Sequence, residues 1–164
     1  MKLRTLLLFA AGFLPAVSSP AQTDQSNDRA KISEAEVNLM RKDLRDQKKQ
    51  VVAANMPLSG DEAAKFWPLY DAYTQETVKI NDRRYALVKE YAANYTTMTD
   101  AQAGSYIRRW IGVDEAASKL RQDWIPKFEQ LVGPKKAAIF FQLDRRTGMM
   151  IELQVASLLP LVQP

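Results

Sequence analysis

Residues 58–95 read LSGDEAAKFWPLYDAYTQETVKINDRRYALVKEYAANY, and the spacing of their apolar side chains decides the fold class. Side chains that recur at alternating intervals of four and three residues form one line along a helix. The positions on this line are Phe66, Tyr70, Tyr73, Thr77, Ile80, Arg84, Leu87, Tyr91 and Tyr95. The pattern predicts one long helix that runs to about Asn94.

Two short motifs mark the starts of helices. In each, a Ser or Thr is preceded by an apolar residue and followed three positions later by Glu or Gln. The two side chains can then accept hydrogen bonds from each other's backbone N–H groups, which is a helix-capping box. The residues are Leu58, Ser59 and Glu62 in the first motif and Met98, Thr99 and Gln102 in the second.

Three further stretches have helical spacing. Residues 33–54 begin with a capping box of Ser33 and Glu36, and the stretch after Gly133 has proline at its first helical position and a stop at Pro160. Pro126 is expected to kink the helix that contains it. The apolar positions are Val37, Met40, Leu44 and Val51; then Ala103, Tyr106, Trp110, Val113, Ala117, Leu120, Trp124, Phe128 and Leu131; then Ile139, Phe140, Leu143, Met150, Leu153 and Leu158.

No stretch shows the alternation typical of a strand. The sequence therefore predicts an all-α protein of about four helices, arranged as long antiparallel helical hairpins or as an elongated bundle. Residues 33–164 are expected to form a single helical domain, which suits the length of the chain.

The N-terminus has the pattern of a secretory signal peptide. Lys2 and Arg4 precede the apolar run 6–14, and small residues follow. The run is too short for a bilayer, which needs roughly 20 apolar residues. We expect residues 1–21 to be a signal peptide cleaved after Ala21, with Ser18 as the alternative, and residues 22–32 to be a flexible spacer. The mature protein would be periplasmic, with no stable membrane anchor.

Composition excludes several classes of function. The chain has no histidine and no cysteine, which removes the usual general base, the thiol nucleophile and the best transition-metal ligands. Without Lys2 and Arg4 the formal net charge is +2, so we expect no nucleic-acid partner. The glycines are scattered singly and form no phosphate-binding loop. We expect no cofactor and no metal.

Catalysis would have to use carboxylates. A glycosidase-like pair could be drawn from several acids, but nothing in the sequence singles out two of them. We therefore predict no catalytic residues and interpret the acids as solvated groups or as partners of arginines. The acids considered are Asp71, Asp82, Asp114, Asp144 and Glu152.

Three pairs of adjacent arginines lie within predicted helices, at 83–84, 108–109 and 145–146. Neighbouring helical positions point about 100° apart, so one arginine of each pair can face solvent while the other reaches a neighbouring helix. Because Arg84 lies on the apolar line, we predict that it pairs with a carboxylate on another helix. The alternative is a basic groove for an anionic ligand.

A partner surface is predicted from residues off the apolar lines. Its members are Trp67, Phe141, Arg83, Arg108 and Arg145. The apolar C-terminal residues 158–162 could pack back on the bundle, which we favour, or offer an edge to a partner.

The two capping motifs resemble those of the LTxxQ-motif periplasmic proteins, the Spy and CpxP group. Ser59 and Glu62 stand where that family has Thr and Gln. A looser similarity to uncharacterised exported bacterial proteins extends from Leu44 through Trp67-Pro68, Tyr91 and Asn94-Tyr95 to residues 140–146. The resemblance implies a helical cradle, often dimeric, that holds unfolded envelope proteins without ATP or senses envelope stress.

Together these features predict a non-catalytic periplasmic helical protein that binds a protein partner or client and is chaperone-like or related to envelope stress. A homodimer is an open possibility. The alternative functions are a structural or assembly component of an envelope complex and, third, a carboxylate-dependent enzyme.

Overall fold

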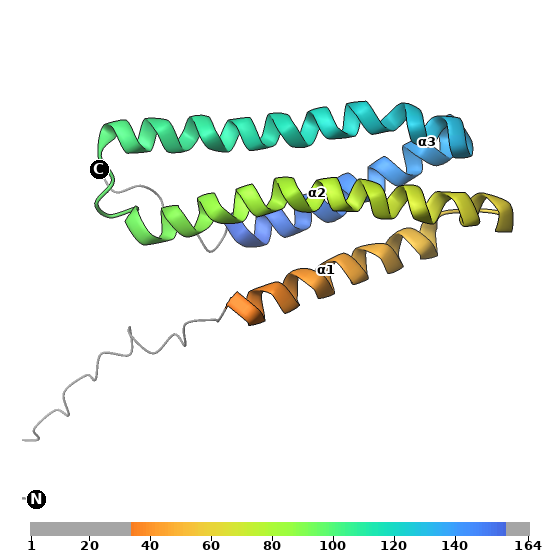
Figure 1. Ribbon diagram of the computed structural model, residues 1–164, viewed down its shortest axis with the longest axis horizontal. Coiled ribbons are helices and arrows are strands. Elements are labelled where there is room, and N and C mark those ends of the chain that lie inside the picture. The colour runs from red at the N-terminus through yellow and green to blue at the C-terminus, as the bar shows by residue number, and fades with distance from the viewer. Residues whose placement is uncertain (1–33, 157–164) are drawn as a thin grey trace, which may run out of the picture.

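The computed structural model describes residues 34–156, which form three α-helices. They are α1 (Glu34–Asn55), α2 (Gly60–Asn94) and α3 (Asp100–Ala156). Figure 1 shows α2 and the first part of α3 lying antiparallel, after which α3 turns back along the bundle. The helix α1 lies along one side, where it contacts α3. The predicted all-helical fold is confirmed for these residues.

Both predicted capping motifs form their hydrogen bonds. The Glu62 backbone N–H donates to Ser59 Oγ at 3.3 Å, and the Ser59 N–H donates to a Glu62 carboxylate oxygen at 2.8 Å. At the start of α3, Thr99 and Gln102 make the same reciprocal pair at 2.9 and 3.3 Å. Each pair satisfies two N–H groups that a helix end leaves without a partner, which fixes where α2 and α3 begin.

The number of helices differs from the predicted four. Gly133 has φ 79° and ψ 160°, which is the only non-helical conformation inside α3 and which reverses the direction of the chain. Helical geometry resumes at Pro134 without an intervening loop, so α3 consists of two helices that meet directly at Gly133. We call residues 100–132 the first arm and residues 134–156 the second arm. The break lies at Gly133, while the helix continues through Pro126.

The core is an aromatic cluster between α2 and both arms of α3. The Phe128 and Phe140 rings, one from each arm, stack at 4.4 Å, and Phe66 of α2 meets both edge-on at 5.5 and 5.6 Å. Aromatic pairs in these geometries add stability beyond the area they bury. We define the cluster as Phe66, Trp67, Tyr70, Tyr73, Trp124, Phe128, Phe140 and Phe141.

The predicted apolar lines hold for α2 and the first arm, where every position is buried or half-buried. They are partly wrong elsewhere. In α1, Met40 and Val51 are exposed and Val52 is buried instead. In the second arm, Met150 and Leu153 are exposed, because the inward face continues through Thr147 and Ile151.

Several predictions lie outside the described residues. These are the signal peptide 1–21 with its cleavage site, the spacer 22–32, the Ser33 cap, and the apolar end 157–164 with Pro160.

Candidate functional site

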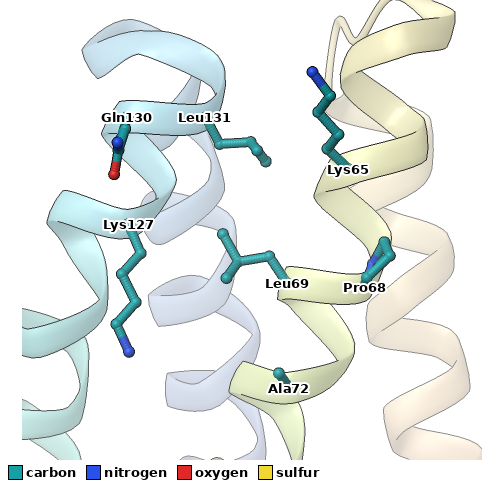
Figure 2. A pocket seen from close by; sticks show the side chains of 7 residues that line it. All are labelled: Lys65, Pro68, Leu69, Ala72, Lys127, Gln130 and Leu131. Carbon is teal, nitrogen blue, oxygen red and sulfur yellow. The ribbon is translucent and has the colours of Figure 1, made fainter.

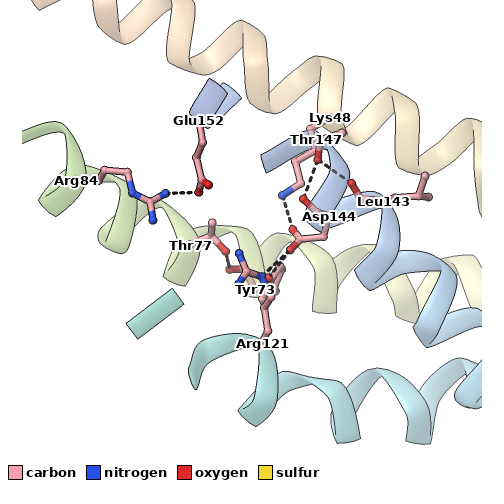
Figure 3. A network of polar contacts seen from close by, with 9 residues as sticks. All are labelled: Lys48, Tyr73, Thr77, Arg84, Arg121, Leu143, Asp144, Thr147 and Glu152. Carbon is pink, nitrogen blue, oxygen red and sulfur yellow. Dashed lines mark hydrogen bonds and ion pairs between the residues drawn. The ribbon is translucent and has the colours of Figure 1, made fainter. Parts of the chain in front are cut away.

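Asp144 is the centre of a polar network that joins all three helices (Figure 3). Its side chain is 4% exposed. Lys48 of α1 donates to Oδ1, while the Tyr73 hydroxyl of α2 and Arg121 Nε of the first arm donate to Oδ2 at 3.0 and 3.4 Å. A buried carboxylate is tolerated only when it is paired and hydrogen-bonded, and here three donors satisfy it. The network fixes the register of the three helices relative to one another.

Tyr73 acts as a hydrogen-bond donor in this network. Burial raises the pKa of its hydroxyl well above the usual value of 10.0, and the negative charge of Asp144 raises it further. Burial also raises the pKa of the neighbouring Tyr70 to about 12. Both hydroxyls therefore keep their protons at neutral pH, so Tyr73 holds Asp144 by donation and does not serve as a base.

Arg84 makes a second junction, nearer the other end of the bundle. Its guanidinium donates to Asp114 of the first arm at 2.6 Å and to Glu152 of the second arm at 2.8 Å. The Arg84 side chain is 17% exposed, whereas both carboxylates are about half exposed (48% and 49%). This confirms the predicted pairing of Arg84 with a carboxylate outside its own helix. Arg109 also reaches a neighbouring helix, where it pairs with Glu90 of α2.

The acids considered as catalytic candidates are not brought together as a free pair. Asp71 pairs with Lys49, Asp82 with Arg41, and the other three lie in the two junctions described above. Each is thus engaged by a cation from another helix or from the other arm.

The predicted partner-surface residues come from α2 and from both arms of α3. Trp67 and Phe141 are half-buried and pack against the aromatic cluster, so they form no open aromatic patch. Arg83, Arg108 and Arg145 are exposed, as predicted, but they lie on α2, the first arm and the second arm respectively.

Among the described residues, eight large apolar side chains are exposed, and four of them, Met40, Val51, Met150 and Leu153, belong to the predicted helical lines. They occur as pairs and triplets on three helical segments. The strongest group is at the end of the second arm, where Met150 is 66% and Leu153 is 73% exposed. The full set is Leu39, Met40 and Val51 on α1, Ile107 and Ile111 on the first arm, and Met149, Met150 and Leu153 on the second arm. Helical spacing alone does not separate such residues from core residues.

A shallow groove runs between α2 and the first arm, near the Gly133 end (Figure 2). Leu69 and Leu131 form its apolar part, and Lys65 and Lys127 stand at its sides. The Lys127 ammonium lies 4.0 Å from the centre of the Trp124 ring, which is a cation–π contact. The groove is open to solvent and lacks the enclosure that small-molecule sites have.

Two kinds of site are not found within residues 34–156. No three acidic side chains there are grouped so that they could hold a metal ion. None of the helices in this range has a stretch both long and apolar enough to cross a bilayer.

Comparisons of the chain with protein-family models, curated proteins and solved structures found no match. Membership of the LTxxQ-motif family therefore stays a prediction, based on the two capping motifs and the N-terminal pattern.

Proposed function

We propose that this protein is a non-catalytic, periplasmic helical protein that binds apolar segments of other proteins and keeps them from aggregating without ATP. The observation that carries the proposal is the exposed apolar group Met149, Met150 and Leu153 at the end of the second arm. Exposed groups of large apolar side chains mark binding sites for proteins or membranes. Methionines suit varied partners because their side chains are unbranched and polarisable.

The rest of the molecule supports a binding role. The aromatic cluster and the Asp144 network hold the helices in fixed register, so the exposed apolar side chains stand on a rigid support. The charged residues beside them, such as Arg145 and Arg146, keep such a surface solvated. This arrangement supports transient contact with unfolded segments better than closure around a small ligand.

The test is suppression of aggregation of an unrelated, chemically denatured protein, followed by light scattering at near-stoichiometric ratio. We expect suppression by the wild-type chain and a clear loss with the double variant Met150→Gln and Leu153→Gln. Both positions are exposed, so the variant should fold normally. The matched control is Lys135→Gln with Ala138→Gln, two exposed positions on the same arm. Equal suppression by all three proteins would contradict the proposal, and so would no suppression by any.

A further inference from the structure

The inward face of α1 alternates apolar and cationic side chains. Val37, Leu44 and Val52 lie toward the bundle, and the positions between them on the same face are Arg41 and Lys48. Val52 is the only buried residue of α1. The side of α1 that docks is therefore a cationic amphipathic surface and not an apolar stripe, which explains why the predicted line through Met40 and Val51 is wrong.

The surface that receives α1 is complementary to it. It presents three carboxylates, two from α2 and one from the second arm: Asp82 receives Arg41, Asp71 receives Lys49 at 2.7 Å, and Asp144 receives Lys48. We call this surface the α1 seat. It extends from Asp82 to the aromatic cluster.

Aromatic rings of α2 line the same seat on either side of Asp71 and Asp82. The Lys49 ammonium lies 5.4 Å from the Trp67 ring and 5.7 Å from the Tyr70 ring, and the Arg41 guanidinium lies 5.3 Å from the Tyr85 ring. Each ring attracts a cation through its face. Carboxylates and ring faces thus recognise the same two side chains of α1, Arg41 and Lys49, and this pairing suits a helix with cations about two turns apart.

α1 is anchored by the buried Val52 and by Lys48, but its contacts with α2 are weak. No Cα atom of α1 lies within 8 Å of a Cα atom of α2, so long side chains bridge the two helices. The ion pairs that join α1 to α2 all have at least one partner that is about half exposed, as in Glu34–Lys89. The pair Lys48–Asp144, which joins α1 to α3, is more buried. Ion pairs of this kind contribute little and are screened by salt. Helices with few buried contacts open most readily from the folded state.

We propose that the α1 seat is an exchangeable docking site for a cationic amphipathic helix of a partner protein, with α1 as its resident occupant. The partner helix would carry Lys or Arg at intervals of seven or eight residues, as α1 does at positions 41, 48 and 49, with apolar residues between them, and would displace α1. The α1 seat is a second binding surface, separate from the exposed apolar group Met149, Met150 and Leu153. The proposal rests on the proposed function only in that both require the protein to bind other proteins.

The first experiment uses a fluorescein-labelled peptide of residues 34–55 as the probe, and the purified chain as the receptor in fluorescence anisotropy. A peptide can bind only the fraction of molecules whose seat is open, so weakening the resident α1 should raise the apparent affinity. We expect the chain with Arg41→Ala and Lys49→Ala to bind the peptide about five- to tenfold more tightly than wild type. A peptide of the same composition in scrambled order should bind neither chain.

The second experiment tests the seat in that same background. Since the resident α1 then lacks these two cations, reversing the seat acids changes the affinity of the peptide with little effect on α1. Adding Asp71→Lys and Asp82→Lys should weaken peptide binding about tenfold or more. A peptide with Glu at positions 41 and 49 should restore it. Both acids are more than half exposed, so the variants should fold, which circular dichroism checks.

Equal binding of the scrambled peptide, or no effect of the acid reversal, would overturn the proposal. A dimer in light scattering that takes up no peptide would also overturn it, since the seat would then belong to α1 of a second copy. The outcome is independent of the test of aggregation. Met150→Gln with Leu153→Gln should leave peptide binding unchanged, and the Asp71 and Asp82 reversals should leave suppression of aggregation unchanged.

Discussion

One carboxylate, that of Asp144, accepts hydrogen bonds from α1, α2 and the first arm of α3. In a seam of aromatic and aliphatic side chains, several relative positions of two helices can have similar packing energies. A buried acid with directional donors favours one of them, because any sliding leaves a charge without a partner. Asp144 therefore contributes to the uniqueness of the fold as well as to its stability.

Replacing Asp144 with Asn should lower the free energy of unfolding by about 2 to 3 kcal/mol. The amide keeps the shape and can accept from Tyr73, but it no longer neutralises Lys48 and Arg121. Urea denaturation followed by circular dichroism at 222 nm measures the change. The control is Asp46→Asn, whose pair with Lys42 is exposed on α1 and should change the free energy of unfolding much less. Similar values for the two variants would show that the network does not stabilise the fold.

Arg84 lies on the apolar line of α2 but ties both arms of α3 together. Arg84→Met should lower the melting temperature by about 3 to 8 °C, since it leaves Asp114 and Glu152 without their common cation. The matched control is Arg83→Met, at the adjacent exposed position, which should change the melting temperature little. A melting temperature that is unchanged or higher in Arg84→Met would show that apolar packing serves equally well there.

At the scale of the element, Gly133 is the residue at which the chain reverses direction between the two arms of α3. Its φ of 79° with ψ of 160° lies in a region that residues with a Cβ rarely adopt. No atom lies within 4 Å of the position where a Cβ would stand, so strain in the backbone, and not crowding, requires glycine here. In the sequence Gly133-Pro134, the glycine allows the reversal, and the proline, whose fixed φ suits the first helical position, begins the second arm.

Gly133→Ala should therefore destabilise the fold by about 1 to 3 kcal/mol. Gly112→Ala makes the same chemical change within the first arm, where the added methyl group also meets nothing. There it should stabilise the protein by up to about 1 kcal/mol, because alanine is the better helix former. Urea denaturation of both variants gives the comparison. A stabilising Gly133→Ala would mean that the turn adopts another conformation in solution.

The elements also show what the sequence could predict. Helical spacing identified the buried faces of α2 and the first arm, because these elements are covered by neighbours along their whole length. It failed for Met40, Val51, Met150 and Leu153, since spacing does not reveal where a neighbouring helix ends or is held off by long side chains. The predicted break at Gly133 was correct, but one non-helical residue was enough to make it.

The candidate site could be predicted only in part. Arg84 stood out because a charge on an apolar line needs a partner. Asp144 did not stand out, since it resembles four other acids in the sequence and is distinguished only by the donors that three segments bring to it. The seat of α1 was likewise missed, because its acids and aromatic rings come from separate elements.

At the scale of the whole molecule, ion pairs connect segments that are far apart in the chain. Glu62 shows how this affects acid stability. The ammonium of Lys136 and the Ser59 N–H lower the pKa of Glu62 from 4.5 to about 2. A carboxylate with a depressed pKa contributes stability that is fully present above the unfolded value of 4.5 and is lost as the pH falls toward 2.

Glu62→Gln should therefore flatten the fall in melting temperature between about pH 5 and pH 2.5. The glutamine can still complete the capping box with Ser59, so that the change isolates the ionic contact with Lys136. Thermal unfolding across that pH range measures the slope. Parallel curves for the variant and wild type would show that the titration of Glu62 does not contribute.

Lys48 and Asp144 are 96 positions apart, and this separation sets the order in which the molecule can assemble. While the ribosome makes the chain, α2 and the first arm can join as a local hairpin, but the part of the α1 seat that holds Asp144 is synthesised well after α1. Closing so long a loop is slow and entropically costly. α1 can therefore dock only after the second arm has been made, and until then this nascent cationic helix is exposed to other binding partners.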